Sequence, residues 1–290
     1  MSDVAPTGEL IARDASALSR LFRDVQPAEG ASRWLLRALS LLSALAVWHV
    51  CSTRQLNLGL VDFVNVPTPS AVLAAWLELW ASPKLRQHLQ SSILRVFVGF
   101  AAAALLGVTA GLSIGRSRRV ADLLLPTLEV LRPIPAVAWI PLAILMFPSS
   151  ELSMMFITFL GAFFPILLNA IHGSANIDRR LLAAASCLGA SRWQLLREVV
   201  LPGSLPNIVT GLAIGMGTAW FCLVTAEMIA GQYGIGYYTW ESYNLQRYPE
   251  IVVGMLLIGA FGMGSSALVR QLGAAMTPWQ RLRGGFAHVG

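Results

Sequence analysis

Long apolar segments without formal charge recur along this chain of 290 residues. A helix needs about 20 such residues, at about 1.5 Å each, to cross a hydrocarbon core of about 30 Å. Four segments meet this length, namely residues 96–115, 152–171, 205–226 and 251–269. Only 12% of the residues are charged, about half of the roughly 25% found in soluble domains. The sequence therefore predicts an all-α, polytopic membrane protein.

Two further segments complete a set of six transmembrane helices. Residues 34–51 carry one charge, Arg37, near the start of the segment. Residues 120–147 form the other segment, and four prolines interrupt it: Pro126, Pro133, Pro135 and Pro141. An even number of crossings places both termini on the same side of the membrane.

The basic residues predict which side that is. With the N-terminus inside, fifteen arginines fall in cytoplasmic segments, whereas the outer segments hold Arg54, Lys84, Arg86 and Arg247. Cytoplasmic loops of membrane proteins collect Arg and Lys, so both termini are expected to be cytoplasmic. The same rule accounts for the net charge of +6 without a nucleic-acid partner.

The chain is expected to have three parts. Residues 1–33 form a cytoplasmic segment in which apolar residues recur at helical spacing, which is typical of an amphipathic helix on the membrane surface. A partly disordered tail is the alternative reading. Residues 34–272 form the transmembrane domain, whose first span is expected to be retained as an anchor, and residues 273–290 form a cytoplasmic tail.

The longest inner loop, residues 173–204, is expected to contain two short helices. Asp178 can cap the first helix, and Gly189 can end it. Ser191 followed by Gln194 is a capping-box pattern that opens the second helix. Two prolines are expected to separate that helix from the next span, Pro202 and Pro206. A DNA-binding helix-turn-helix is disfavoured because membrane spans flank the loop, so a cytoplasmic protein is the expected partner.

The loop resembles the EAA loop of binding-protein-dependent ABC importer permeases. In that family the pattern is Glu-Ala-Ala, three residues, Gly, nine residues, Ile, one residue, Leu-Pro. The spacing here fits, with Gly189 in the Gly position and Val199 in the Ile position. Ala183 replaces the family Glu, so no ion pair from that carboxylate is expected. The resemblance implies a type I ABC importer permease fold and a loop that docks into a groove of the ATPase subunit.

The resemblance assigns the ATPase-coupling role to Ala184, Ala185, Leu188, Gly189, Ala190, Arg192, Leu201 and Pro202. It extends over most of residues 67–279 and narrows to permeases that import nitrate, taurine and aliphatic sulfonates. The segments that carry this narrower resemblance are residues 131–142, 161–169, 189–193, 226–230 and 234–237.

Several partners follow from the resemblance. They are two ATP-binding-cassette ATPase subunits, an extracytoplasmic solute-binding protein and a second permease copy in the bacterial inner membrane. A homodimer is expected, and a heterodimer remains open. The implied function is a translocation pathway through the lipid bilayer for a small anionic solute.

The chain itself carries no recognisable catalytic or metal site. A phosphate-binding Walker loop needs a lysine, and the single lysine, Lys84, lies in an outer segment. ATP and Mg²⁺ are therefore expected on the partner ATPase, with no cofactor on this chain. The four histidines and three cysteines lack ligand spacing, and the histidines are expected at the interface or in solvent. The alternative function is an autonomous secondary transporter or channel, which is disfavoured because midplane carboxylates are scarce.

Two positions within apolar segments are candidates for the translocation pathway. Glu129 and Arg132 are three residues apart and are expected to pair on one helix face, next to Pro133 and Pro135. Arg132 can either brace this kink or attract an anionic substrate. Glu227 lies near the outer end of its span, where a gating contact and a structural hydrogen bond are equally compatible with the pattern.

Glycines repeat every four residues in two of the apolar segments. One face contains Gly107, Gly111 and Gly115, and another contains Gly211 and Gly215. Such small faces allow helices to approach closely in membranes. The spacing leaves open whether they pack within one subunit or between two.

Overall fold

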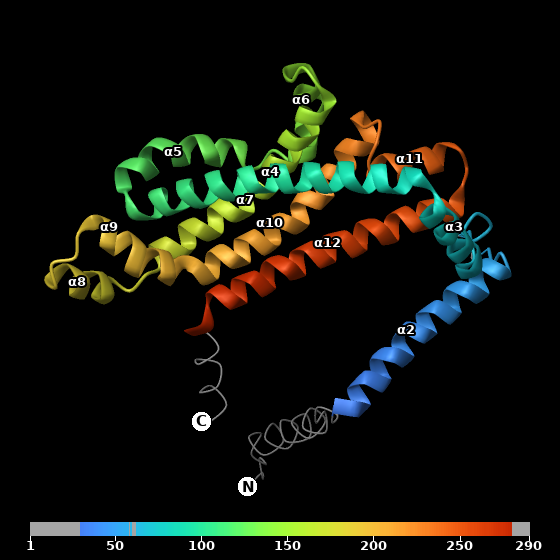
Figure 1. Ribbon diagram of the computed structural model, residues 1–290, viewed down its shortest axis with the longest axis horizontal. Coiled ribbons are helices and arrows are strands. Elements are labelled where there is room, and N and C mark those ends of the chain that lie inside the picture. The colour runs from blue at the N-terminus through green and yellow to red at the C-terminus, as the bar shows by residue number, and fades with distance from the viewer. Residues whose placement is uncertain (1–29, 58, 60–61, 280–290) are drawn as a thin grey trace, which may run out of the picture. The chain divides into compact units, whose positions relative to one another are not determined.

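The computed structural model describes residues 30–57, 59 and 62–279 (Figure 1). The amphipathic helix expected in residues 1–33 lies outside the described residues, except for its last four positions, which begin helix α2 (Gly30–Thr53). The cytoplasmic tail after residue 279 also lies outside them. The chain divides into two compact units, and the boundary along the sequence lies between Pro69 and Ser70. Helix α2 therefore belongs to a different unit from the other helices.

The first unit contains α2 and the connection that follows it. Within this unit, most apolar side chains of α2 are not covered by other residues. The Trp48 indole donates a hydrogen bond to the Pro67 carbonyl at 3.1 Å. Asn57 and Asp62 form a single antiparallel bridge.

The described secondary-structure elements of the second unit are all helices, joined by short connections. Its elements are α3 (Pro69–Ala81), α4 (Pro83–Arg116), α5 (Arg118–Leu131), the 3-10 helix η1 (Ala136–Trp139), α6 (Ile140–Met146), α7 (Ser150–Ala175), α8 (Arg179–Cys187), α9 (Arg192–Gln194), the π-helix η2 (Leu195–Val200), α10 (Leu201–Ala230), α11 (Ile235–Asn244) and α12 (Tyr248–Met276). The short helices α8 and α9 lie at one end of this unit, which we call the loop end, and α11 lies at the other, the α11 end (Figure 1).

Helix α7 forms the centre of the second unit and packs against α4 and α10. Small residues make this packing close: a Cβ added at Gly111 of α4 would lie 2.5 Å from the Ala170 Cβ of α7, and one at Gly211 of α10 would lie 2.6 Å from the Asn169 Cβ. Gly107 and Gly215 both face Ile166. Both glycine faces therefore pack within one subunit, which decides between the two alternatives that the sequence left open.

Five described helices are long and apolar enough to cross a membrane: Trp34–Thr53, Pro83–Arg116, Ser150–Ala175, Arg192–Ala230 and Tyr248–Met276. The expected span at residues 120–147 is instead a pair of helices, α5 and η1–α6, bent by 83°. Pro133 and Pro135 lie at the bend, where proline lacks an amide hydrogen and disfavours helical backbone in the preceding residue. The all-α fold with up to six spans is confirmed, and the sixth is a broken span or a re-entrant loop.

The loop between α7 and α10 has the two expected helices. The Asp178 side chain accepts a hydrogen bond from the Arg180 amide at 2.8 Å and caps α8. Gly189 has φ of +82° and ends this helix, in a backbone region that favours glycine. The Ser191–Gln194 capping box opens α9.

The expected break at Pro202 and Pro206 is wrong. The chain remains helical from Arg192 to Ala230, a length of 39 residues. Pro202 falls in the first turn of α10, directly after the π-helical turn. Prolines are tolerated in membrane helices because such local adjustments satisfy the freed backbone groups. The loop end and the α11 end are consequently joined by one continuous helix.

Candidate functional site

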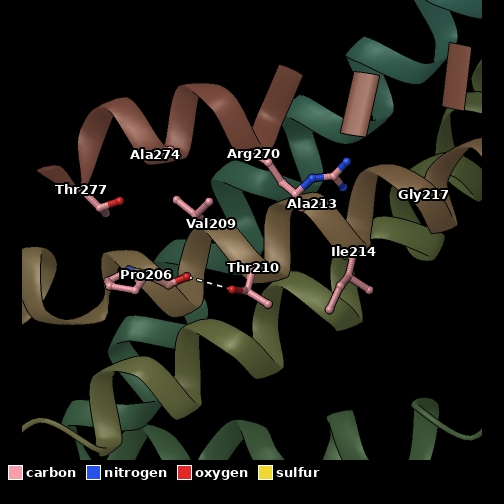
Figure 2. A pocket seen from close by; sticks show the side chains of 9 residues that line it. All are labelled: Pro206, Val209, Thr210, Ala213, Ile214, Gly217, Arg270, Ala274 and Thr277. Atoms are coloured by element: carbon pink, nitrogen blue, oxygen red, sulfur yellow. Dashed lines mark hydrogen bonds between the residues drawn. The ribbon is translucent and has the colours of Figure 1, made fainter. Parts of the chain in front are cut away.

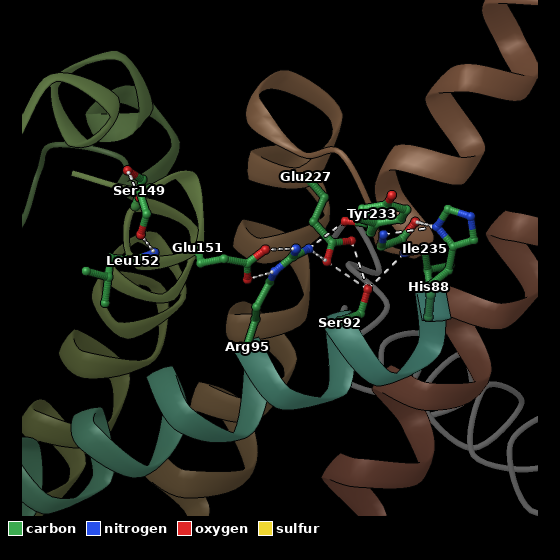
Figure 3. A network of polar contacts seen from close by, with 11 residues as sticks. His88, Ser92, Arg95, Ser149, Glu151, Leu152, Glu227, Tyr233 and Ile235 are labelled. Carbon is green, nitrogen blue, oxygen red and sulfur yellow. Dashed lines mark hydrogen bonds and ion pairs between the residues drawn. The ribbon is translucent and has the colours of Figure 1, made fainter. Parts of the chain in front are cut away.

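A buried arginine lies at the centre of a polar network toward the α11 end (Figure 3). The Arg95 side chain of α4 is 1% exposed, and its Nη1 donates to Glu227 Oε1 at 2.8 Å and to the Tyr233 carbonyl at 2.6 Å. Its Nε donates to Glu151 Oε2 at 2.7 Å, and Nη2 donates to the other oxygen of the same carboxylate. One guanidinium therefore connects α4, α7, α10 and the segment that follows α10.

Glu227 is fully buried, and its carboxylate has several donors besides Arg95. The Ser92 hydroxyl donates to it at 2.7 Å, and the Gly236 amide donates to Oε2 at 2.9 Å. The Ile235 amide in turn donates to Ser92 Oγ at 2.8 Å. Gly234 has φ of +132°, and a side chain there would collide with the Glu227 carboxylate. The turn between α10 and α11 is thus fixed by hydrogen bonds to buried groups.

His88 extends the network by one turn of α4 toward the start of that helix. Its Nδ1 lies 3.0 Å from the Gly234 carbonyl and 3.1 Å from the Gly234 amide nitrogen, so the tautomer decides which contact is a hydrogen bond. The ring also lies beside three tyrosines, Tyr233, Tyr237 and Tyr238. The expectation that histidines are interfacial or solvated is wrong for His88, which is buried. The fold buries it because the α10–α11 turn folds back onto α4.

Tyr238 of α11 links this region to α12. Its hydroxyl donates a long hydrogen bond, 3.4 Å, to Glu250 Oε2. Burial raises the pKa of the Tyr238 phenol well above its ordinary value, so the hydroxyl remains a donor at neutral pH. This contact contributes to the position of α11 above the network.

Sequence reasoning placed Glu227 near the end of its span but missed the residues that pair with it. The expected span 96–115 begins just after Arg95, and the expected span 152–171 begins just after Glu151. A usable signal was present, because Arg95, Glu151 and Glu227 all border apolar segments on the same predicted side of the membrane. Opposite charges at one depth are expected to find each other in a bundle.

The expected ion pair between Glu129 and Arg132 is absent, although both residues are described. Helix α5 ends at Leu131, so Arg132 occupies the C-cap position, where the chain begins its bend. Both side chains are exposed. Arg132 still has helical backbone, with its N–H bonded to the Leu128 carbonyl, so the separation of three residues allows a contact, but the two exposed side chains do not make it.

Arg132 and Pro135 line a cavity of about 370 Å³ between the bend, α7 and α10. Among the described residues, Arg132 is the only charged one in the lining, which otherwise includes the aromatic side chains Trp139, Phe156, Phe164 and Phe221. The Thr218 hydroxyl in this wall donates to the Gly161 carbonyl at 2.7 Å. A cation in a largely apolar wall can hold an anion that has an apolar part. Glu227 does not line this cavity, so the candidate pathway residues fall at two separate places.

A second cavity lies between α10 and α12, with a volume of about 570 Å³ (Figure 2). Val209, Thr210 and Ile214 of α10 face Ala274 and Thr277 of α12 across it. Arg270 is the only charged side chain in the lining. Like the cavity at the bend, which contains Arg132, this cavity therefore contains one arginine, and none of the residues of the Arg95 network lines it.

The loop end exposes apolar side chains. Leu188, just before the Gly189 turn, is 89% exposed, and Trp193 at the start of α9 is 67% exposed. The other residues assigned to the coupling loop by resemblance lie in the same α8–α10 segment. Exposed apolar groups at the tip of two capped helices are typical of a protein-docking surface.

Across the described part of the chain, His, Cys, Asp and Glu side chains form no group of three or more that could hold a metal ion. The network around Arg95 is instead saturated by hydrogen bonds and ion pairs. Its chemistry is that of a structural junction between helices.

Comparison with known proteins identifies related chains. Residues 103–282 match the family model described as the binding-protein-dependent transport system inner membrane component. The putative aliphatic sulfonates transport permease protein of Bacillus subtilis strain 168 is 33% identical over 85% of this chain and 88% of its own length. The taurine transport system permease protein of Escherichia coli strain K12 is 34% identical over 81% and 86%.

Two further similarities were found. The nitrate import permease protein of Synechocystis sp. is 32% identical over 83% of this chain and 88% of its own. A solved chain of the MetNI methionine ABC transporter, in an inward-facing conformation, covers 64% of this chain at 19% identity with a TM-score of 0.48. The family match spans more than half of the sequence. The sulfonate, taurine and nitrate permeases named here exceed 30% identity over most of it. The chain therefore belongs to the inner-membrane permease components of binding-protein-dependent ABC importers.

Proposed function

We propose that this permease forms the translocation pathway for a small anionic solute of the sulfonate, taurine or nitrate type. The observation that carries the proposal is the cavity at the bend, where Arg132 lies unpaired among aromatic side chains. Arg132 is exposed and forms no ion pair with a described residue, so its charge is available to attract an anion that enters the cavity. Three similar permeases are named for aliphatic sulfonates, taurine and nitrate.

In this proposal Arg132 and Pro135 line the pathway at the bend, Pro133 helps to form the bend, and Glu129 lies next to it but outside the cavity lining. Pro133 and Pro135 give the chain a break without regular helical hydrogen bonds, and such backbone is tolerated at membrane depth where it lines a cavity. Glu227 contributes indirectly, because it fixes the turn after α10 through Gly236 and Arg95. The bend is therefore the substrate-contacting element, and the Arg95 network is its support.

The energy comes from partners in this proposal. Two ATP-binding-cassette ATPases bind ATP and Mg²⁺, and an extracytoplasmic solute-binding protein delivers the substrate to a homodimer of this chain. The chain has both termini in the cytoplasm, binds no cofactor and catalyses no reaction. The exposed Leu188 and Trp193 support ATPase docking at the loop end, together with Ala184, Ala185, Gly189, Ala190, Arg192, Leu201 and Pro202.

The continuous helix from Arg192 to Ala230 supports a direct mechanical connection. Closure of the ATPases would move the loop end, and α10 would carry that motion to the cavity wall at Thr218 and Phe221. The pathway then alternates between outward-open and inward-open states.

The test is reconstitution of the complete importer in liposomes, with candidate anions added one at a time together with the binding protein. We expect one anion to stimulate both ATP hydrolysis and uptake. Gly189→Val places a β-branched residue at positive φ, which such residues avoid, and should reduce the ratio of uptake to hydrolysis about tenfold or more.

Gly189→Asn is the matched control, because Asn adopts this backbone region more readily. It should retain most of the coupling. Uptake by this chain alone, without ATP or partners, would instead identify a secondary transporter or channel. Equal coupling in the Val variant and the unmodified chain would remove the loop from the mechanism.

A further inference from the structure

Two arginines without partners line one cavity at the loop end. The cavity has a volume of about 720 Å³ and lies between the α4–α5 turn and the α9–η2 segment. Arg116 lines it from the first side and Arg192 from the second. Both side chains are exposed, and neither forms an ion pair with a described residue. No acidic side chain lines the cavity, so its positive charge is not neutralised within the described chain.

Each of these arginines lies at the end of a candidate membrane span. Arg116 is the last residue of the span Pro83–Arg116, and Arg192 is the first residue of the span Arg192–Ala230. In the proposed orientation both arginines lie on the cytoplasmic side, where anionic headgroups attract basic residues close to the membrane.

The remainder of the lining is mainly apolar. Leu112 of α4 and Leu195, Leu196 and Val200 of η2 form much of the wall. A free phosphate ion would satisfy the arginines but leave this apolar surface in contact with water. A ligand with an anionic head and a hydrocarbon chain satisfies both parts, because arginine binds phosphate oxygens through paired N–H donors and apolar burial is favourable.

We propose that this cavity binds an anionic phospholipid, with the headgroup phosphate between Arg116 and Arg192 and an acyl chain against the leucine wall. Basic pockets between membrane helices are typical sites for such lipids. The volume falls within the range of about 300–1,000 Å³ that is usual for ligand pockets, which accommodates a headgroup and the adjoining part of a chain. The lipid would connect the end of α4 to the start of the α9–α10 helix.

This site differs from the proposed pathway at Arg132, and its lipid occupancy does not require transport. Arg192 is shared with the proposed coupling loop, so a bound lipid would constrain the segment that joins the loop to α10. The leaflet depends on the proposed orientation, which makes it the cytoplasmic one. Lipid binding can be measured on the purified permease, so its failure is distinguishable from failure of the transport proposal.

The test is native mass spectrometry of the full chain, titrated in detergent with dioleoyl phosphatidylglycerol or dioleoyl phosphatidylcholine. We expect the anionic lipid to be retained about tenfold more strongly, because each arginine near the membrane surface contributes to its attraction. Arg116→Gln combined with Arg192→Gln should remove this preference. Arg118→Gln combined with Arg119→Gln is the matched control, since it removes the same charge close by but outside the cavity lining, and it should leave the preference intact.

Several outcomes would overturn the proposal. Equal loss in the control pair would indicate general surface electrostatics, and retained preference in the Arg116 and Arg192 pair would place the lipid elsewhere. Displacement by soluble glycerol 3-phosphate at the concentration of the lipid would identify a free-phosphate site. If the double variant does not fold, the single variants Arg116→Gln and Arg116→Lys answer the question, with a loss expected for Gln and most binding retained for Lys.

Discussion

Two arginines within apolar surroundings have opposite environments in this permease. Arg95 is 1% exposed and is bound by Glu151, Glu227 and the Tyr233 carbonyl, whereas Arg132 is exposed and has no ion pair with a described residue. The partners of Arg95 lie 56 and 132 residues away in the chain, while Arg132 has a glutamate only three residues away and does not contact it. In this comparison the buried arginine is paired with distant carboxylates and the exposed arginine is not paired with a nearby one, so closeness along the sequence does not by itself predict an ion pair.

The two arginines also differ in what their charges do for the fold. A buried ion pair adds little stability relative to a well-packed apolar core, but removal of one partner leaves an uncompensated charge. Arg95 is therefore required once Glu227 is buried. The charge of Arg132 is not used in this way, which leaves it available for a ligand.

The largest effect is expected for Arg95→Met. It leaves the Glu227 carboxylate buried with only neutral donors, Ser92 and the Gly236 amide, and should lower the free energy of unfolding by about 3–5 kcal/mol. Denaturant unfolding of the purified chain in detergent measures this loss. Combining the change with Glu227→Gln removes the stranded charge and should restore a large part of the stability; a loss under about 1 kcal/mol in the single variant would show that the ion pair is not needed.

A smaller effect is expected for Glu151→Gln. The Glu151 side chain is 55% exposed, so solvent screens its interaction with Arg95, and Arg95 still has Glu227 as a counter-ion. We expect the free energy of unfolding to fall by about 1 kcal/mol, measured in the same way. Glu78→Gln is the control, because Glu78 is exposed and has no ion pair with a described residue. A loss for Glu151→Gln as large as that for Arg95→Met would mean that the two carboxylates contribute equally.

Arg132→Gln tests the other half of the comparison. Its effect on unfolding should lie within about 0.5 kcal/mol, as for surface substitutions, whereas uptake by the reconstituted importer should fall about tenfold, equivalent to about 1.4 kcal/mol of binding. Arg132→Lys keeps the charge and should retain more uptake. Unchanged uptake in Arg132→Gln, or a large loss of stability, would assign Arg132 the same structural role as Arg95.

The smallest effect is expected for Glu129→Gln. Glu129 neither pairs with Arg132 nor lines the cavity at the bend, so uptake should stay within about twofold and stability within about 0.5 kcal/mol. Liposome uptake and unfolding of the same preparations provide both values. If this change instead reverses the defect of Arg132→Gln, the two residues pair in another state of the transport cycle.

Features that depend on neighbouring residues could be predicted from the sequence. The capping groups Asp178 and the Ser191–Gln194 pair, and the positive φ of Gly189, are determined within a few residues. The spans follow from apolar length, and the glycine faces follow from their spacing. These signals place the loop end correctly before any tertiary contact is known.

Features that depend on tertiary contacts could not be predicted in the same way. Local rules predict a helix break at Pro202, but the helix continues through this residue after a π-helical turn. The Arg95 network unites four chain segments, and only the packing of α4 and α10 against α7 brings them together. The expected Glu129–Arg132 pair is absent because a separation of three residues permits a contact between two exposed side chains but does not require one.

The pairing of Arg95 also bears on the order in which the chain enters the membrane. Synthesis adds about 5–20 residues per second, so Glu227, which lies 132 residues after Arg95, is made roughly 7–26 s later. An unpaired arginine at the border of an apolar segment is costly to insert, although less so than one at the centre of a membrane helix, where the cost is about 2.5–3.5 kcal/mol on insertion scales. Of the two carboxylates that bind Arg95, Glu151 is made first, 56 residues after Arg95. The complete network therefore requires that the residues of α10 have been synthesised.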